Sequence, residues 1–169
     1  MLAPALIQQL RQIAGDRGVL HQPHDLMLYE YDGSVETGRP DCVVFPSSTE
    51  QVAAIVKLAK EHNLVLVGRG AGTGLSGGAI ARHGGIMIGF ARMNRILEID
   101  LENERAVVEP GVVNLDLTLA VQGQGYFYAP DPSSQRACTI GGNVCENAGG
   151  PHTLAYGVTT NHVLGLEAV

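Results

Sequence analysis

The sequence has little of several features that particular classes of protein need. Its 169 residues include no tryptophan, only 5% aromatic residues and three cysteines, Cys42, Cys138 and Cys145. An odd number of cysteines without a repeated spacing argues against a disulfide framework and fits a reducing compartment. We therefore interpret all three as small buried side chains, and we expect no metal site in this chain.

Positive charge and long apolar runs are also scarce. Eleven lysine and arginine residues stand against seventeen acidic residues, for a net charge of −6, and they form no basic patch. Binding to nucleic acid depends on many such cations, so we expect no nucleic-acid partner. No apolar run approaches the ~20 residues of a membrane span. The N-terminus lacks a basic segment followed by an apolar stretch, so we expect no signal peptide and a cytoplasmic protein.

Glycine, by contrast, is abundant. Its 22 residues are about 13% of the chain, against ~7% in an average protein. They gather in residues 68–78, 84–89 and 141–150 and follow no period. Hydrophobic residues make up 45% of the chain and charged residues 17%, which excludes a disordered chain. Clustered glycine indicates backbone that approaches another group closely or adopts conformations that a Cβ forbids.

Hydrophobic spacing predicts one β-α-β unit in the first half of the chain. Residues 42–45 and 64–67 are short apolar runs, typical of buried strands, and residues 86–88 predict a third strand. The helix between the first two strands is expected to begin at Ser48, whose side chain would cap it while Gln51 reaches back. Because this helix is the crossover, the two strands are predicted to be parallel.

Further elements are predicted on both sides of this unit. They are a helix within residues 1–18 ended by Gly15 and Gly18, a short helical turn within 21–31, a connector over 33–40, a β-hairpin over 95–101 and 105–109, a helix over 115–121 capped by Asn114, a helix within 139–148 and a strand over 163–169. We divide the chain into an N-terminal helical extension, residues 1–38, and a domain over residues 39–169. Since no turn or polar tail follows the last apolar strand, we expect a domain truncated at its C-terminus.

The first glycine cluster follows a predicted parallel strand. Residues 69–78 have the sequence R-G-A-G-T-G-L-S-G-G, which exposes successive backbone N–H groups suited to binding an anion. Thr73 and Ser76 add hydroxyl donors, and Arg69 is the one cation at the mouth of the loop. With so little positive charge, the loop suits a diphosphate bridge inside a larger cofactor. A mobile surface loop is the alternative. Five glycines would then add conformational entropy to the unfolded chain without a bound ligand to offset it.

Two common nucleotide-binding motifs are not satisfied by this sequence. Residues 72–77 match G-x-G-x-x-G, but the dinucleotide fingerprint needs a helix at once and an acidic residue about 20 positions later. Residues 78–85 contain three glycines, and no carboxylate ends the strand over 86–88. No G-x-x-x-x-G-K-[ST] motif is present, which excludes a nucleoside triphosphatase of the P-loop type.

A second small-residue region lies over residues 130–150. The turn over 130–134 carries two hydroxyls and a carboxylate, and residues 139–143 are predicted to open a helix whose N-terminus no side chain blocks. Such an end binds anions or carbonyl oxygens. An ordinary helix with a glycine cap is the alternative. Two such regions in one small domain favour a single extended ligand that both regions contact.

Three motifs in this order resemble the FAD-linked oxidases of the vanillyl-alcohol oxidase type. They are R-G-A-G-T-G-L-S-G-G-A from Arg69, Y-A-P-D-P-S-S from Tyr128 and I-G-G-N-V-C-E-N-A-G-G from Ile140. Within that family the sequence most resembles the glycolate oxidase branch, with D-lactate and D-2-hydroxyglutarate dehydrogenases as relatives. The resemblance implies an α+β fold of the PCMH type. A small parallel β-α-β subdomain would precede an incomplete, mainly antiparallel subdomain.

The resemblance also implies an FAD site. The first loop would wrap the diphosphate, residues 130–134 would lie near the diphosphate and ribityl chain, the second glycine cluster would line the flavin, and the last strand would run beside the adenosine half. The implied cofactor-binding residues are Arg69, Gly70, Ala71, Gly72, Thr73, Gly74, Leu75, Ser76, Gly77, Pro130, Asp131, Pro132, Ser133, Ser134, Thr139, Gly141, Gly142, Asn143, Asn147, Gly149 and Val163. Thr73 stands where some members carry a histidine bonded to FAD, which implies non-covalent FAD.

The activity implied by the resemblance is oxidation of a 2-hydroxy acid, of the glycolate or D-lactate type, to the 2-oxo acid by hydride transfer to FAD. Another FAD-containing subunit and an iron–sulfur subunit would be partners and would place the protein at the inner face of the membrane. Two alternatives stay open. One is another flavoenzyme of this fold, an enolpyruvyl nucleotide sugar reductase or an alditol oxidase. The other is a cofactor-binding fragment without turnover.

No catalytic residue is assigned within this chain. His152, Tyr156 and His162 follow the second glycine cluster, where they either reach the flavin edge or, in the simpler interpretation, order the loop over residues 149–157. A base for the hydroxyl proton and a cationic clamp for the carboxylate are needed for the reaction. The resemblance implies that both lie beyond Val169, with the substrate-binding domain and the metal-binding histidines of the family.

Overall fold

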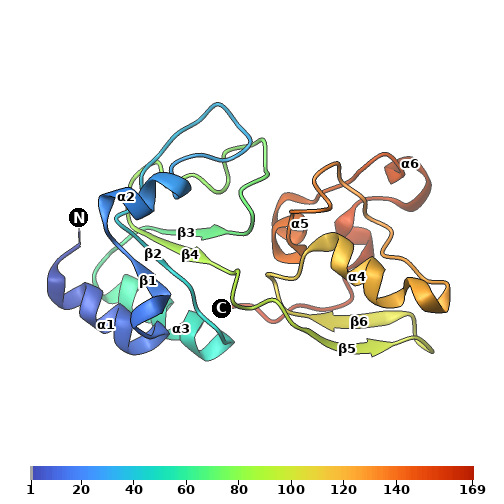
Figure 1. Ribbon diagram of the computed structural model, residues 1–169, viewed down its shortest axis with the longest axis horizontal. Coiled ribbons are helices and arrows are strands. Elements are labelled where there is room, and N and C mark those ends of the chain that lie inside the picture. The colour runs from blue at the N-terminus through green and yellow to red at the C-terminus, as the bar shows by residue number, and fades with distance from the viewer. Residues whose placement is uncertain (1) are drawn as a thin grey trace. The chain divides into compact units, whose positions relative to one another are not determined.

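The computed structural model describes residues 2–169, so Met1, which the predicted N-terminal helix included, lies outside the described residues. The chain separates into two compact units, the first formed by residues up to Arg92 together with Val169, the second by residues 93–168. The first contains a mainly parallel sheet and the second an antiparallel hairpin with helices, which is an α+β fold as predicted (Figure 1).

A four-stranded sheet forms the centre of the first unit. Its strands are β1 (Val19–Leu20), β2 (Cys42–Val44), β3 (Leu66–Arg69) and β4 (Ile86–Gly89), in the order β1-β2-β4-β3. β4 pairs in parallel with both β2 and β3, and β1 pairs antiparallel to β2. The predicted parallel β-α-β unit is confirmed, with β4 inserted between its strands. All four residues of β4 are buried, which suits the inner position that it takes.

Helices cover both faces of this sheet. On one face, α1 (Pro4–Ala14) and α3 (Thr49–Glu61) pack their apolar sides, including Leu10 and Ile55, against β2 and β4. On the other face, Leu26 of α2 (Pro23–Leu26) packs against Met87. Each such large apolar side chain contributes about 1.5–3 kcal/mol when fully buried. This two-sided burial fixes the sheet whose β3 end leads into the first glycine loop.

The predicted start of α3 is confirmed in its main feature. Ser48 Oγ accepts a hydrogen bond from the Gln51 backbone N–H at 3.4 Å. The Gln51 side chain reaches back one residue further than expected, because its Oε1 accepts from the Ser47 N–H at 2.8 Å. α1 ends at Ala14, and Gly15, with a φ of +81°, is its C-cap as predicted, while Gly18 lies in the 3-10 turn that follows.

The second unit consists of a hairpin and short helices. Its elements are β5 (Ile96–Asp100), β6 (Arg105–Val108), α4 (Asn114–Val121), α5 (Ile140–Glu146) and α6 (Thr153–Tyr156). Shorter 3-10 turns in the two units span Asp16–Gly18, Met27–Tyr29, Gln122–Gln124 and Thr159–His162. The hairpin is antiparallel as predicted, with an irregularity between Ile96 and Glu98.

Two predictions for the second unit are wrong. Asn114 does not cap α4: it is the first residue inside the helix, and its Nδ2 donates instead to the Pro130 carbonyl at 2.9 Å. Residues 163–169 form no strand, and Leu164 is 81% exposed. A strand is held by hydrogen bonds to a neighbour, and no strand within residues 2–169 pairs with this segment.

The division of the chain at residue 38 into an extension and a domain stays a prediction, although α1 contributes to the core of the first unit. Among residues 2–169, no helix combines the length and the apolar character needed to cross a bilayer.

The base of the hairpin is closed by a buried carboxylate. Glu109, 7% exposed at its side chain, accepts hydrogen bonds from the Arg95 backbone N–H at 2.8 Å and from Arg95 Nη2 at 2.7 Å. These bonds from Arg95 hold the pKa of Glu109 below its usual value. A carboxyl whose pKa falls on folding stabilises the fold above its unfolded pKa, and this contribution disappears as the pH drops through the folded pKa.

We therefore expect Glu109→Gln to remove part of the acid sensitivity of the protein. In urea unfolding, the free energy of unfolding of the unaltered chain should fall as the pH drops below 4.5, the usual pKa of glutamate. We expect this decrease to be about 1 kcal/mol larger than in the variant. Glu102→Gln, at an exposed position between the two hairpin strands, is the matched control. Equal pH dependence of the unaltered chain and Glu109→Gln would contradict the prediction.

Candidate cofactor-binding site

The first glycine loop leaves β3 with its backbone donors unused. None of the N–H groups of residues 70–74 donates to a backbone carbonyl within residues 2–169. Backbone N–H groups are obligatory donors, and successive unpaired ones form a nest for an anion. This part of the chain therefore leaves several neutral donors unpaired, and their role in binding an anion stays a prediction.

Two glycines define the shape of this loop. Gly72 has a φ of +70°, which strains other residues, and a Cβ at this position would meet the Arg69 guanidinium, so glycine is favoured here. At Gly74 an added Cβ would meet no atom within 4 Å and would enter open space. The loop is thus backed by Arg69 at Gly72 and open at Gly74, where a side chain would enter unoccupied space.

Arg69 lies beneath the loop and not at its mouth, which corrects the sequence interpretation. The residue is 7% exposed, its Nη1 donates to the Ala79 carbonyl at 3.4 Å, and its guanidinium lies 5.7 Å from the centre of the Tyr29 ring. Burial lowers the pKa of Arg69, while the nearby Asp32 carboxylate raises it. Arg69 therefore supports the loop from inside. Whether it also contacts a cofactor stays a prediction.

One side of the loop is closed by a segment that the sequence suggested only as a connector. A Cβ on Gly33 would lie 2.9 Å from the carbonyl oxygens of both Thr73 and Gly74, so the two backbones are in close contact. The turn at this point is held by the Ser34 N–H, which donates to Asp32 Oδ1 at 2.7 Å. The D-G-S sequence at residues 32–34 was the available signal for such a turn.

In the second unit, the segment over residues 130–134 is fixed at several points. Asn114, 1% exposed, donates to the Pro130 carbonyl from α4. The Ser134 carbonyl accepts from the N–H groups of Ala137 and Cys138, both at 2.8 Å. Asp131 is bound by His152. This segment is therefore a rigid turn, as its sequence predicts.

The start of α5 is not the open anion-binding end that we expected. The Ile140 N–H donates to the Val112 carbonyl and the Gly141 N–H to the Pro110 carbonyl, both at 2.8 Å. Thr139 Oγ1 accepts from the Gly142 N–H at 3.2 Å, which is an ordinary N-cap. These first-turn donors are used by the protein itself. The role of these residues toward a cofactor therefore stays a prediction.

Two further features of this helix bear on a ligand. Asn143 Nδ2 is buried and has no hydrogen-bond partner within the described part of the chain. Asn147 ends α5 with a φ of +51°, and its Oδ1 accepts from the Thr160 N–H at 3.1 Å. Val163 follows the adjacent 3-10 turn as half-buried irregular backbone, so the strand predicted there is absent.

The two histidines after the second glycine cluster both contact other residues of the protein. His162 Nε2 lies 2.9 Å from the Tyr156 carbonyl, and His152 Nδ1 lies 2.6 Å from Asp131 Oδ2. Both contacts favour the simpler of the two interpretations of these residues.

Cys145 is exposed, contrary to the expectation that all three cysteines are buried, because α5 turns Asn143 and not Cys145 inward. No group of three His, Cys, Asp or Glu within residues 2–169 is arranged to hold a metal ion.

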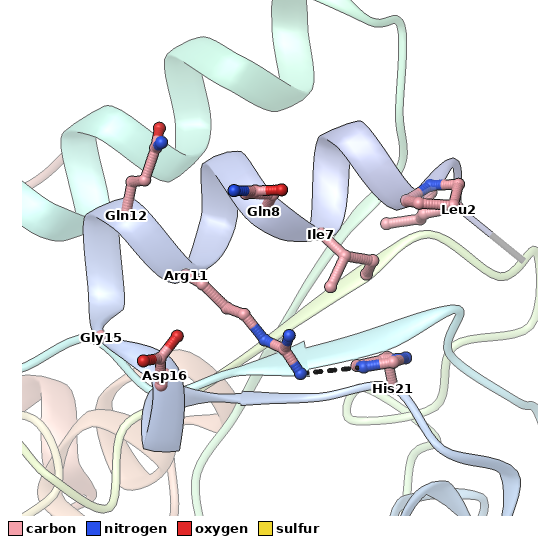
Figure 2. A pocket seen from close by; sticks show the side chains of 9 residues that line it. Leu2, Ile7, Gln8, Arg11, Gln12, Gly15, Asp16 and His21 are labelled. Carbon is pink, nitrogen blue, oxygen red and sulfur yellow. Dashed lines mark hydrogen bonds between the residues drawn. The ribbon is translucent and has the colours of Figure 1, made fainter.

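A groove beside α1 lies in the first unit (Figure 2). Arg11 and His21 line it together, with Arg11 Nη2 3.1 Å from His21 Nε2, and Leu2 and Ile7 supply apolar surface. None of the residues predicted to bind the cofactor lines this groove. This groove is therefore no part of the predicted cofactor site.

Comparisons with known proteins agree with these motifs. The family model described as an FAD binding domain matches residues 40–169. The chain is 42% identical to glycolate oxidase subunit GlcD of Bacillus subtilis (strain 168), over 100% of this chain and 36% of that protein. It is 37% identical to the D-lactate dehydrogenase of Anaerostipes hadrus, over 99% of this chain and 35% of that protein.

A solved structure of alkyldihydroxyacetonephosphate synthase matches the fold, with a TM-score of 0.86 at 22% identity over 97% of this chain and 32% of that chain. The predicted fold class is thereby confirmed. The chain spans about a third of the length of all three proteins.

We expect Gly74→Val to weaken FAD binding by at least about tenfold, because the new side chain fills the open side of the loop. The fold should be unchanged, since the added Cβ meets no protein atom. Gly72→Val should also lower the melting temperature, because it combines a positive φ with a clash against Arg69. Fluorescence titration with FAD and thermal melting measure the two effects.

Gly123→Val is the matched control, because a Cβ there also meets no atom within 4 Å and the residue lies outside the predicted site. FAD affinity of Gly74→Val equal to that of the control would show that the loop does not hold the cofactor.

Proposed function

This chain belongs to the FAD-binding domain family, and on that premise we propose that it is the cofactor-binding part of an oxidoreductase that oxidises a 2-hydroxy acid to the 2-oxo acid. The similar proteins are named for glycolate and D-lactate, both of which are 2-hydroxy acids. Because the chain spans about a third of those proteins, the complete reaction belongs to a longer protein. The relatives carry the substrate part of this proposal, and the unpaired donors of residues 70–74 support its cofactor part.

The residues of the first unit fit the diphosphate of FAD. Neutral backbone N–H groups of residues 70–74 would donate to its oxygens, and the open space at Gly74 would let the chain approach them. Arg69 is buried beneath the loop, so these donors would bind the diphosphate without an exposed cation from Arg69. This arrangement suits a chain whose net charge is −6.

The second unit would contribute to the remainder of the cofactor. The hydroxyls of Ser133 and Ser134 lie in a fixed turn near the anchored Pro130 and would bind toward the ribityl chain. Asn143 has a buried amide nitrogen without a partner in the described chain, which favours a contact with the flavin side of the ligand. Bound FAD supplies the acceptor for the hydride. The remaining residues of the predicted set belong to the same proposal.

We further propose that FAD is held without a covalent bond, because Thr73 offers only a hydroxyl at the loop position where some members carry a histidine. The word subunit in the name of the Bacillus subtilis relative supports partner subunits. We propose that these are an FAD-containing subunit and an iron–sulfur subunit in the cytoplasm, where they would bring the protein to the inner face of the membrane.

FAD binding itself is tested by titration of the chain with FAD and with FMN. FMN lacks the diphosphate bridge that the first loop would hold, so its affinity should be at least about tenfold lower. Precipitation with acid should release all flavin into the supernatant, as expected for a non-covalent cofactor. Equal affinities for FAD and FMN, or flavin retained in the precipitate, would contradict this part of the proposal.

Turnover separates a cofactor-binding fragment from a complete enzyme. We expect the 169-residue chain with bound FAD to show no glycolate- or D-lactate-dependent dye reduction, because no base or carboxylate clamp is assigned within it. A longer protein that contains this chain should reduce the dye with a 2-hydroxy acid. Turnover by the chain alone would place the base and clamp inside residues 1–169.

A further inference from the structure

His152 contacts Asp131 at two points. The Nδ1 atom of His152 lies 2.6 Å from Asp131 Oδ2, and the His152 backbone N–H donates to Asp131 Oδ1 at 3.4 Å. The hydrogen bond from His152 holds the pKa of the Asp131 carboxyl below its usual value, so this side chain stays ionised. Two contacts to one carboxylate fix its orientation as well as its distance.

The backbone next to His152 is shaped for the same contact. Gly150 has a φ of +149°, and a Cβ at this residue would collide with the Asp131 carbonyl oxygen and with Asp131 Oδ1. Only glycine allows the chain to approach Asp131 so closely. The contact is therefore built by the main chain of residues 150–152 together with the imidazole.

Asp131 and the preceding Pro130 are each held by a hydrogen bond from a different part of the chain. Asn114 of α4 donates to the Pro130 carbonyl at 2.9 Å, and His152 binds the next residue along the chain. The segment over residues 130–134 is thus fixed between α4 and residues 150–152. Its carboxylate is occupied by protein donors, while the hydroxyls of Ser133 and Ser134 remain on the same turn.

We propose that His152 is a positioning residue for FAD: by binding Asp131 it fixes the segment over residues 130–134 in the conformation that receives the cofactor. This inference rests on the proposed function, because it assumes that the segment binds FAD. Asp131 is then an anchor of the site, and its carboxylate is directed to His152 and not to the cofactor. A segment ordered before binding loses less conformational freedom when the ligand arrives.

Holding the carboxylate also lessens an electrostatic conflict. FAD carries negative charge on its diphosphate, and an unpaired carboxylate on the same segment would repel it. Hydrogen bonds from His152 stabilise the Asp131 carboxylate and direct it toward residues 150–152. The pair thereby makes an acidic residue compatible with an anionic ligand.

The test is FAD titration of the 169-residue chain carrying His152→Ala, His152→Arg, Asp131→Asn, or His152→Ala with Asp131→Asn. We expect His152→Ala to weaken FAD binding about tenfold, and His152→Arg to restore the affinity to within about threefold, because arginine also donates to a carboxylate. The double variant should bind FAD no more weakly than the weaker single variant, since both substitutions break one contact. Thermal melting of each variant, in the absence of FAD, shows that it is folded.

His24→Ala is the matched control, because His24 is an exposed histidine that lies 3.5 Å from the neighbouring Asp25 outside the predicted site. It should leave FAD affinity unchanged. A folded His152→Ala chain that binds FAD as the unaltered chain does would overturn the positioning role alone. A folded His152→Arg chain that does not recover FAD affinity would also overturn the positioning role alone. Absence of FAD binding by the unaltered chain would overturn the proposed function together with this inference.

Discussion

Unpaired backbone donors after β3 are the constraint on which the site depends. A chain that leaves several N–H groups without carbonyl partners requires another acceptor, and water or a ligand must supply it. The surrounding structure maintains this condition: the Arg69 guanidinium fills the space below Gly72, and residues 32–34 close one side. The loop is consequently held in shape by side chains and backbone that do not themselves use its donors.

The sheet of the first unit explains why these donors gather at one place. The loop follows β3, which lies at the edge of the sheet and pairs in parallel with β4 over Leu66–Arg69. Because β4 is buried and also pairs with β2, this ladder fixes the point at which the loop begins. In the second unit, by contrast, side-chain contacts fix the backbone of the predicted site. Asn114 and His152 hold adjacent residues of one turn, although neither belongs to a sheet.

Sequence patterns predicted the parts of this protein whose signals are local. The cap at Ser48, the parallel unit, the hairpin and the glycine loop all follow from spacing over a few residues. The failures involve partners distant in sequence. Asn114 is of a residue type that often caps helices, yet its amide donates to the Pro130 carbonyl. The N–H groups at the start of α5 donate to carbonyls near residue 110. Residues 163–169 have the composition of a strand but no paired neighbour within the described chain.

The burial of Arg69 has a consequence for the kinetics of ligand capture. With its guanidinium covered, the loop presents dipoles and no exposed full charge of its own, and dipoles act only at short range. An anionic ligand approaching a protein of net charge −6 gains no long-range attraction there, so encounter is not accelerated by steering. Tight binding of such a ligand would then have to arise from slow dissociation and not from fast association.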